Sequence, residues 1–278
     1  MNLLDDDSLY PILKKQILDL DYYRFEVFSK EIVTFQEIRP ELATTLEKLH
    51  EDLKLDHFLT SLIINLKDSN FKLIPFVLDL NDLIFGKSEF HNNERFFENL
   101  CQNIKSQITW QTTPVEIYNI FNKSIAELFF IDYTESLFTY NFNSIIASRK
   151  INLNALALLY LMVAERIDLP IFGMPVYDKL LLCLTKEHCY HNEMVYEDDI
   201  IFYFTPSDNG VVYTVEDLEF IAEKNDLSLD LNSKLPKGNN SIVAHWLFQI
   251  EILQQSPKTS QKLSIYFQQI LELLKNTE

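Results

Sequence analysis

The sequence predicts an α+β protein that is mostly helical and contains one small antiparallel sheet. Apolar residues recur at helical spacing through most of the first 170 residues. After Pro170 the pattern changes to short runs of β-branched and aromatic residues, bounded by Pro, Asp, Asn and Gly, which are typical of strands. With 278 residues, of which 47% are apolar, the chain can bury a sizeable core.

The first expected element is an N-terminal helical segment over residues 1–88. Leu9, Ile12, Leu13, Ile17 and Leu20 follow helical spacing, and similar patterns occur around Leu46 and Leu62. A polar loop at residues 86–93 marks its end.

The second element, residues 89–232, carries the predicted sheet. Helices are expected over 95–107, 114–130 and 152–167, and Thr112-Thr113 before Pro114 provides an N-cap for the second. Strands are expected over 171–176, 179–185, 200–205 and 210–214. Thr214, followed three residues later by Asp217, predicts a further helix by a capping-box pattern.

The third element, residues 233–278, is expected to be a C-terminal helical hairpin. A polar linker over 229–240 leads into two apolar-periodic stretches separated by the turn at Ser256-Pro257.

Composition excludes several classes of function. Four glycines cannot build the clustered-glycine loops that hold nucleotide phosphates. A net charge of −17 has the wrong sign for nucleic acid or an anionic membrane surface. Three cysteines, an acidic N-terminus and the lack of a membrane-length apolar run predict a soluble cytoplasmic protein.

The cysteines and histidines do not follow the spacing of a metal site. Cys183, His188, Cys189 and His191 lie close together, but no second ligand pair repeats elsewhere. We therefore expect no metal and no cofactor, with Cys189 in an exposed polar turn. Cys101 follows an apolar helical face and is expected in the core.

Residues 187–226 are strongly acidic. Asp198 and Asp199 resemble a paired-carboxylate site, but adjacent residues on a strand point to opposite faces and cannot flank one bond. A solvated acidic surface that recognises a basic protein is the better interpretation. Trp110 and Trp246 are not interleaved with bases, so both are expected to fill the core.

The segment SRKINLNALALLYLMVAERIDLPIFGMPVYDKLLLC, residues 148–183, resembles the bacterial SirB-type branch of the transglutaminase-like superfamily. The resemblance covers about residues 90–278 and is most specific over 149–182. It implies a transglutaminase-like (papain-like) core between an N-terminal helical segment and a C-terminal helical repeat-like hairpin.

In the wider superfamily, a Cys at the start of the long helix, a His on one strand and an Asp on the next perform acyl transfer or amide hydrolysis. The resemblance places these positions at Ala155, Lys179 and Thr205. A methyl group cannot attack a carbonyl and an ammonium has no lone pair for a proton. The resemblance therefore implies a pseudoenzyme without catalytic residues.

The expected function is that of a catalytically inactive binding or scaffold module whose partner is another protein, of basic charge. The residual cleft is expected at the three triad positions and their neighbours Asn152, Asn154, Tyr177 and Asp178. The alternative is a cysteine hydrolase or acyltransferase whose nucleophile has moved to Cys183 or Cys189, with His188 or His191 as its base.

Overall fold

A computed structural model describes residues 71–86, 93–134, 136–176, 179–186, 189, 195–207, 211–224 and 235–254. The chain divides into two compact units, Met1–Lys67 and Asp68–Glu278, and every described residue belongs to the second. Most of the predicted N-terminal helices and the second helix of the predicted C-terminal hairpin lie outside the described residues. The predicted domain boundaries at 88 and 232 stay predictions.

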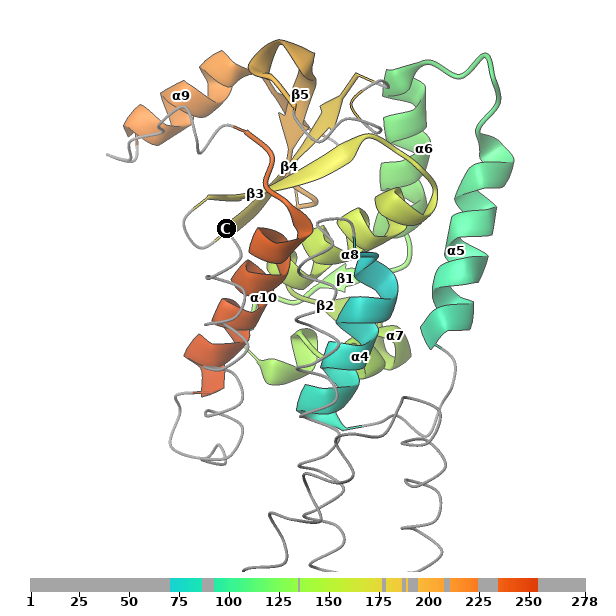
Figure 1. Ribbon diagram of the computed structural model, residues 1–278, viewed down its shortest axis with the longest axis vertical. Coiled ribbons are helices and arrows are strands. Elements are labelled where there is room, and N and C mark those ends of the chain that lie inside the picture. The colour runs from blue at the N-terminus through green and yellow to red at the C-terminus, as the bar shows by residue number, and fades with distance from the viewer. Residues whose placement is uncertain are drawn as a thin grey trace, which may run out of the picture. The chain divides into compact units, whose positions relative to one another are not determined.

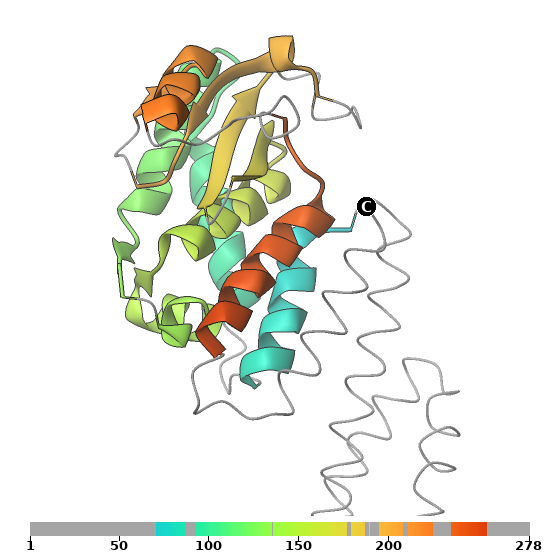
Figure 2. The same ribbon diagram turned by 90° about the vertical axis from the view of Figure 1, so that its left-hand side faces the viewer.

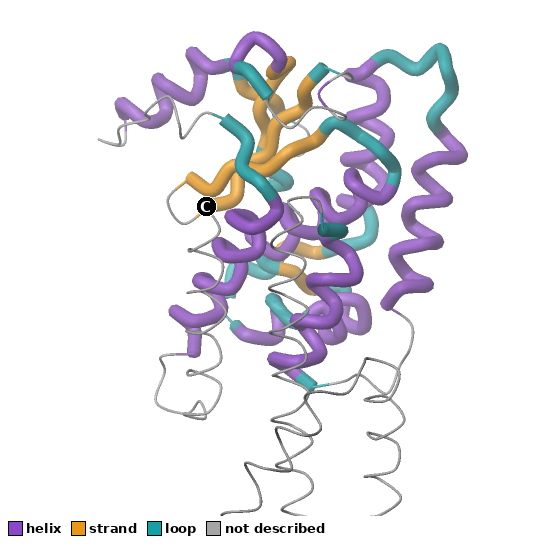
Figure 3. The backbone as a smooth tube through the Cα atoms, in the orientation of Figure 1, coloured by secondary structure: helices purple, strands orange, loops and turns teal. Residues whose placement is uncertain are grey.

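The described part is an α+β structure, as the sequence predicts, with its larger sheet at one end (Figure 1; Figure 3). This sheet is antiparallel throughout, in the order β3 (Ile171–Val176), β4 (Lys179–Thr185), β5 (Ile200–Phe204) and β6 (Val212–Tyr213). The bounds of β3 and β4 match the predicted ranges. The register pairs Gly173 with Leu182 and Leu182 with Phe204, so the end of β5 lies beside the middle of β4.

Helix α8 (Leu153–Arg166) is the centre of the core. Ten consecutive residues, Ala155–Ala164, are buried, so the helix is covered on every side. Strands β3 and β4 pack on it together with α4 (Leu73–Phe85), α5 (Asn93–Gln107) and α10 (Asn239–Gln254). Figure 2 shows α4 and α10 below the sheet. A helix that is apolar all round is stable only when it is enclosed in this way.

The segment after α6 corrects one prediction. The helix expected over 114–130 is α6 (Pro114–Ala126), which starts with the predicted Thr113 cap but ends four residues early. Phe130 instead lies in β1 (Phe130–Ile131), which pairs in parallel with β2 (Lys150–Ile151). The Phe130 N–H donates to the Arg149 carbonyl at 2.8 Å, so a partner distant in sequence determines this conformation.

The remaining elements connect the core to its surface. Helix α7 (Phe142–Ser148) and the 3₁₀ turn η2 (Leu137–Thr139) lie between β1 and β2 in the sequence. The 3₁₀ turn η4 (Glu197–Asp199) precedes β5, and α9 (Val215–Lys224) follows β6. Asp198 and Asp199 therefore lie in a 3₁₀ turn and not on a strand as expected, because Asp199 accepts a hydrogen bond from the Tyr196 N–H at 3.2 Å.

The two tryptophans differ in their exposure to solvent. Trp246 of α10 is buried as predicted, but Trp110 is 91% exposed, so the expectation of a core Trp110 is wrong. Trp110 lies in the turn between α5 and α6, outside both amphipathic helices, where no apolar face covers it. Within the described part, no helix is long and apolar enough to cross a membrane.

Candidate functional site

The N-terminus of α8 is the site where the resemblance places a nucleophile. Asn152 is the N-cap, and its Oδ1 accepts the Ala155 N–H at 2.9 Å. The Asn152 amide donates to the Thr139 carbonyl at 2.6 Å, so hydrogen bonds hold both the oxygen and the nitrogen of this side chain. Ala155 itself is 0% exposed. At this helix end the capping amide, rather than a reactive group, occupies the free N–H, so Asn152 performs a structural role.

Asn154 connects this helix end to the sheet. Its Oδ1 accepts the Leu180 N–H at 3.1 Å, which places the start of α8 beside the start of β4. Lys179 is the first residue of β4 and is exposed. Thr205 follows the last residue of β5, and its hydroxyl lies 2.8 Å from that of Ser207. The antiparallel register pairs Phe204, the last residue of β5, with Leu182, three residues after Lys179, whereas Tyr177 and Asp178 lie outside the described residues.

None of these three positions carries the Cys, His or Asp that the resemblance expects there. Ala155 has no reactive atom, and the Lys179 ammonium can donate but not accept a proton. The Thr205 hydroxyl cannot orient an imidazole as a carboxylate does, and no imidazole stands beside it at position 179.

Cys183 lies on the opposite side of the sheet from α8. A Cβ on Gly173 would meet Leu161 of α8, so the Gly173–Leu182 pair faces α8. The adjacent residue Cys183 therefore faces the other way. There it packs in a buried cluster with Met174 and Tyr203, against which partly buried side chains of α9 lie.

The surroundings of the three thiols keep them protonated. Burial raises the pKa of Cys183 to about 12 and that of Cys101 to about 11. Burial also raises the pKa of Cys189, which is buried, and the expectation of an exposed turn is wrong for this residue. The Cys189 N–H donates to the Lys186 carbonyl at 3.0 Å. His188 and His191, the predicted bases, lie outside the described residues.

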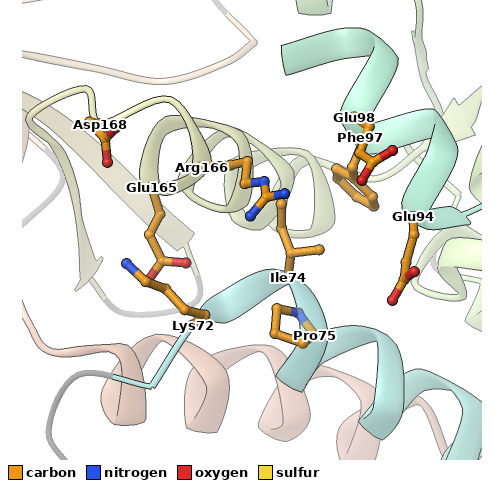
Figure 4. Close-up of a pocket in the computed structure, with 9 residues that line it drawn as sticks. All are labelled: Lys72, Ile74, Pro75, Glu94, Phe97, Glu98, Glu165, Arg166 and Asp168. Carbon is orange, nitrogen blue, oxygen red and sulfur yellow. The ribbon is translucent and has the colours of Figure 1, made fainter. Parts of the chain in front are cut away.

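A second candidate site lies at the opposite end of α8 (Figure 4). A cavity of about 460 Å³ opens between the start of α4, the start of α5 and the end of α8. Two basic and four acidic side chains line it: Lys72, Arg166, Glu94, Glu98, Glu165 and Asp168. The sequence analysis missed this cavity, because its walls come from three helices that no local pattern connects.

Glu165 is the most constrained of these side chains. Its carboxylate accepts the Leu73 N–H at 2.8 Å and the Asn239 amide at 3.1 Å, and so joins α8 to the first residues of α4 and α10. Lys72, the N-cap of α4, forms no side-chain cap, so Glu165 replaces it from another helix. Burial raises the pKa of Glu165, and these hydrogen bonds and the nearby Lys72 partly oppose that rise. We interpret Glu165 as structural.

Within the described ranges, no group of three or more His, Cys, Asp or Glu side chains could hold a metal ion. Comparison of the chain with models of protein families, with curated proteins and with solved structures finds no match.

Proposed function

We propose that this protein is a catalytically inactive, SirB-type transglutaminase-like module that binds another protein. The supporting observation is the N-terminus of α8, where the buried Ala155 stands at the position of the nucleophile and Asn152 occupies its N–H. The hydrogen bond from Leu180 to Asn154 holds the helix against the sheet without a catalytic group. A domain that keeps this packing without a catalytic group can still expose surfaces that bind other proteins.

The surface that we assign to the partner is acidic. Glu197 and Asp198 of η4 are exposed, and so are the four carboxylates of α9, namely Glu216, Asp217, Glu219 and Glu223. We call these six residues the acidic surface. This concentration of negative charge repels nucleic acid and attracts basic proteins. The proposed partner is therefore a basic protein.

The absence of catalysis is tested by the alkylation of Cys101, Cys183 and Cys189 as a function of pH, measured at each site by mass spectrometry. An ordinary exposed thiol titrates near pH 8.5, and an activated thiol well below that. We expect all three to react more slowly in the folded protein than in urea at every pH. Rapid reaction of Cys183 or Cys189 at about pH 6 would show an activated nucleophile and refute the proposal.

The binding role is tested by capturing partners from a lysate of the cells that make the protein. Reversing Glu223 to Lys should release the captured basic protein. Reversing Glu127, which is exposed outside the acidic surface, changes the net charge equally and should retain it. Equal capture by both variants would remove the acidic surface from the proposal.

A further inference from the structure

Helix α9 carries a large aromatic side chain on its solvent side. Val215 and Leu218 pack against the cluster around Cys183, and Ala222 is buried, so these three residues define the inner face. Phe220 lies two residues from Leu218 and from Ala222, which turns it to the opposite face. It is 66% exposed. Figure 1 shows α9 apart from the other helices at the sheet end of the described part.

Carboxylates surround Phe220 on this face. Glu216 and Asp217 lie one turn before it and Glu223 one turn after it, and residues at these spacings are neighbours on a helix surface. Asp217 is held in place, because its carboxylate accepts the Thr214 N–H at 2.8 Å and the Thr214 hydroxyl at 3.0 Å. The backbone hydrogen bond of Glu216 and the Thr214 side chain lower the pKa of Glu216, so this carboxylate stays ionised to lower pH. An apolar ring thus lies among three carboxylates, with the Lys224 ammonium one turn after it.

Such a face fits one kind of side chain better than others. A guanidinium can lie flat on an aromatic ring and at the same time bond a carboxylate at its edge, whereas an apolar partner would desolvate the carboxylates without compensation. A second copy of this chain is disfavoured, because α9 has four carboxylates against one ammonium and would face an equally acidic helix. Charge complementarity therefore selects a basic occupant.

We propose that the outer face of α9 is a docking site for an arginine-bearing segment of the partner protein, with one guanidinium stacked on Phe220 between Glu216 and Glu223. This inference rests on the proposed binding function and specifies its contact. Phe220 supplies selectivity for arginine over lysine, because the planar guanidinium stacks and the ammonium does not. The flanking carboxylates supply the negative charge that attracts the guanidinium.

The test measures binding of a short fluorescein-labelled peptide of alternating Arg and Ser to the full chain by fluorescence anisotropy. At about 150 mM salt, where screening acts beyond about 8 Å, general attraction to an acidic protein is weakened. Phe220→Ala should weaken binding about fivefold, the size of an exposed cation–π contact, and Phe220→Tyr should restore it. The matched control is Phe138→Ala, because Phe138 in η2 is 74% exposed and should not affect the affinity.

Two further comparisons test the role of the carboxylates and the preference for arginine over lysine. Glu223→Lys should weaken binding more than Glu127→Lys, which changes the net charge equally on α6, and the Lys–Ser peptide should bind more weakly than the Arg–Ser peptide. The inference is overturned if the wild-type chain does not bind the Arg–Ser peptide, or if Phe220→Ala behaves like Phe138→Ala. It is also overturned if Phe220→Ala converts a dimer to a monomer in size-exclusion chromatography, since the face would then be a self-interface. None of these results bears on the thiol measurements, so the proposal of an inactive protein stands or falls separately.

Discussion

At the scale of single residues, the polar groups of the core are positioned by hydrogen bonds that join distant parts of the chain. Asn152 connects α8 to η2 through Thr139, and Asn154 connects α8 to β4 through Leu180. Glu165 does the same at the other end of the helix. Each of these side chains satisfies a backbone group that would otherwise be buried without a partner, which is a costly arrangement.

Replacing Glu165 by Ala should destabilise the second unit by about 1–3 kcal/mol, because the Leu73 N–H would lose its acceptor and the Asn239 amide one of its two acceptors. Urea denaturation followed by circular dichroism measures this change. Glu127→Ala is the control, because the pair Lys123–Glu127 is exposed at 3.8 Å and exposed pairs contribute little. If the two variants lose the same stability, Glu165 is not a structural link.

The same residue predicts a pH effect. Burial raises the folded-state pKa of Glu165 above its unfolded value. The stability that this group contributes is therefore complete below the unfolded pKa and is lost as the pH rises through the folded pKa. Glu165→Gln cannot titrate, so wild type should lose stability relative to this variant as the pH rises from the ordinary carboxyl pKa through the raised folded-state pKa of Glu165. A difference that stays constant with pH would contradict the raised pKa.

At the scale of elements, the packing of β3 between α8 and α10 requires a glycine. A Cβ on Gly173 would lie 2.6 Å from Ile242 Cδ1 and 2.7 Å from Leu161 Cδ1. Both contacted atoms belong to buried side chains of enclosing helices, so they have little room to move. The sequence indicated a strand here but gave no sign of the two helices that pack on it.

Gly173→Ala should lower the free energy of unfolding by about 1–3 kcal/mol, the usual cost of overpacking. Gly238→Ala is the matched control, because its added Cβ meets no atom within 4 Å. Adding Ile242→Val removes the closest methyl group and should recover part of the loss in the double variant. If the two substitutions instead lower the stability additively in thermal and urea denaturation, the contact between position 173 and Ile242 does not limit the packing.

At the scale of the whole molecule, the elements that were predicted correctly are those that local sequence patterns determine. The strands β3 and β4 and helix α8 were predicted within about one residue, because Pro170, the β-branched runs and the apolar stretch mark their ends. The pairing of β1 with β2 was missed, because a two-residue strand becomes visible only when Arg149 and Ile151 approach it. The cavity at Glu165 and the exposure of Trp110 were missed for the same reason, since both depend on which surfaces meet.

The enclosure of α8 has a consequence for how the protein is made. Its ten consecutive buried residues leave the ribosome about 75 residues before α10 emerges to cover them, and Asn239 reaches Glu165 only then. During that interval the apolar surface of α8 that α10 covers is exposed to solvent, where it can bind chaperones or aggregate. Among the described helices α10 is made last and completes this core. Premature termination before residue 239 should therefore yield insoluble protein, which the soluble fraction of the truncated chains measures.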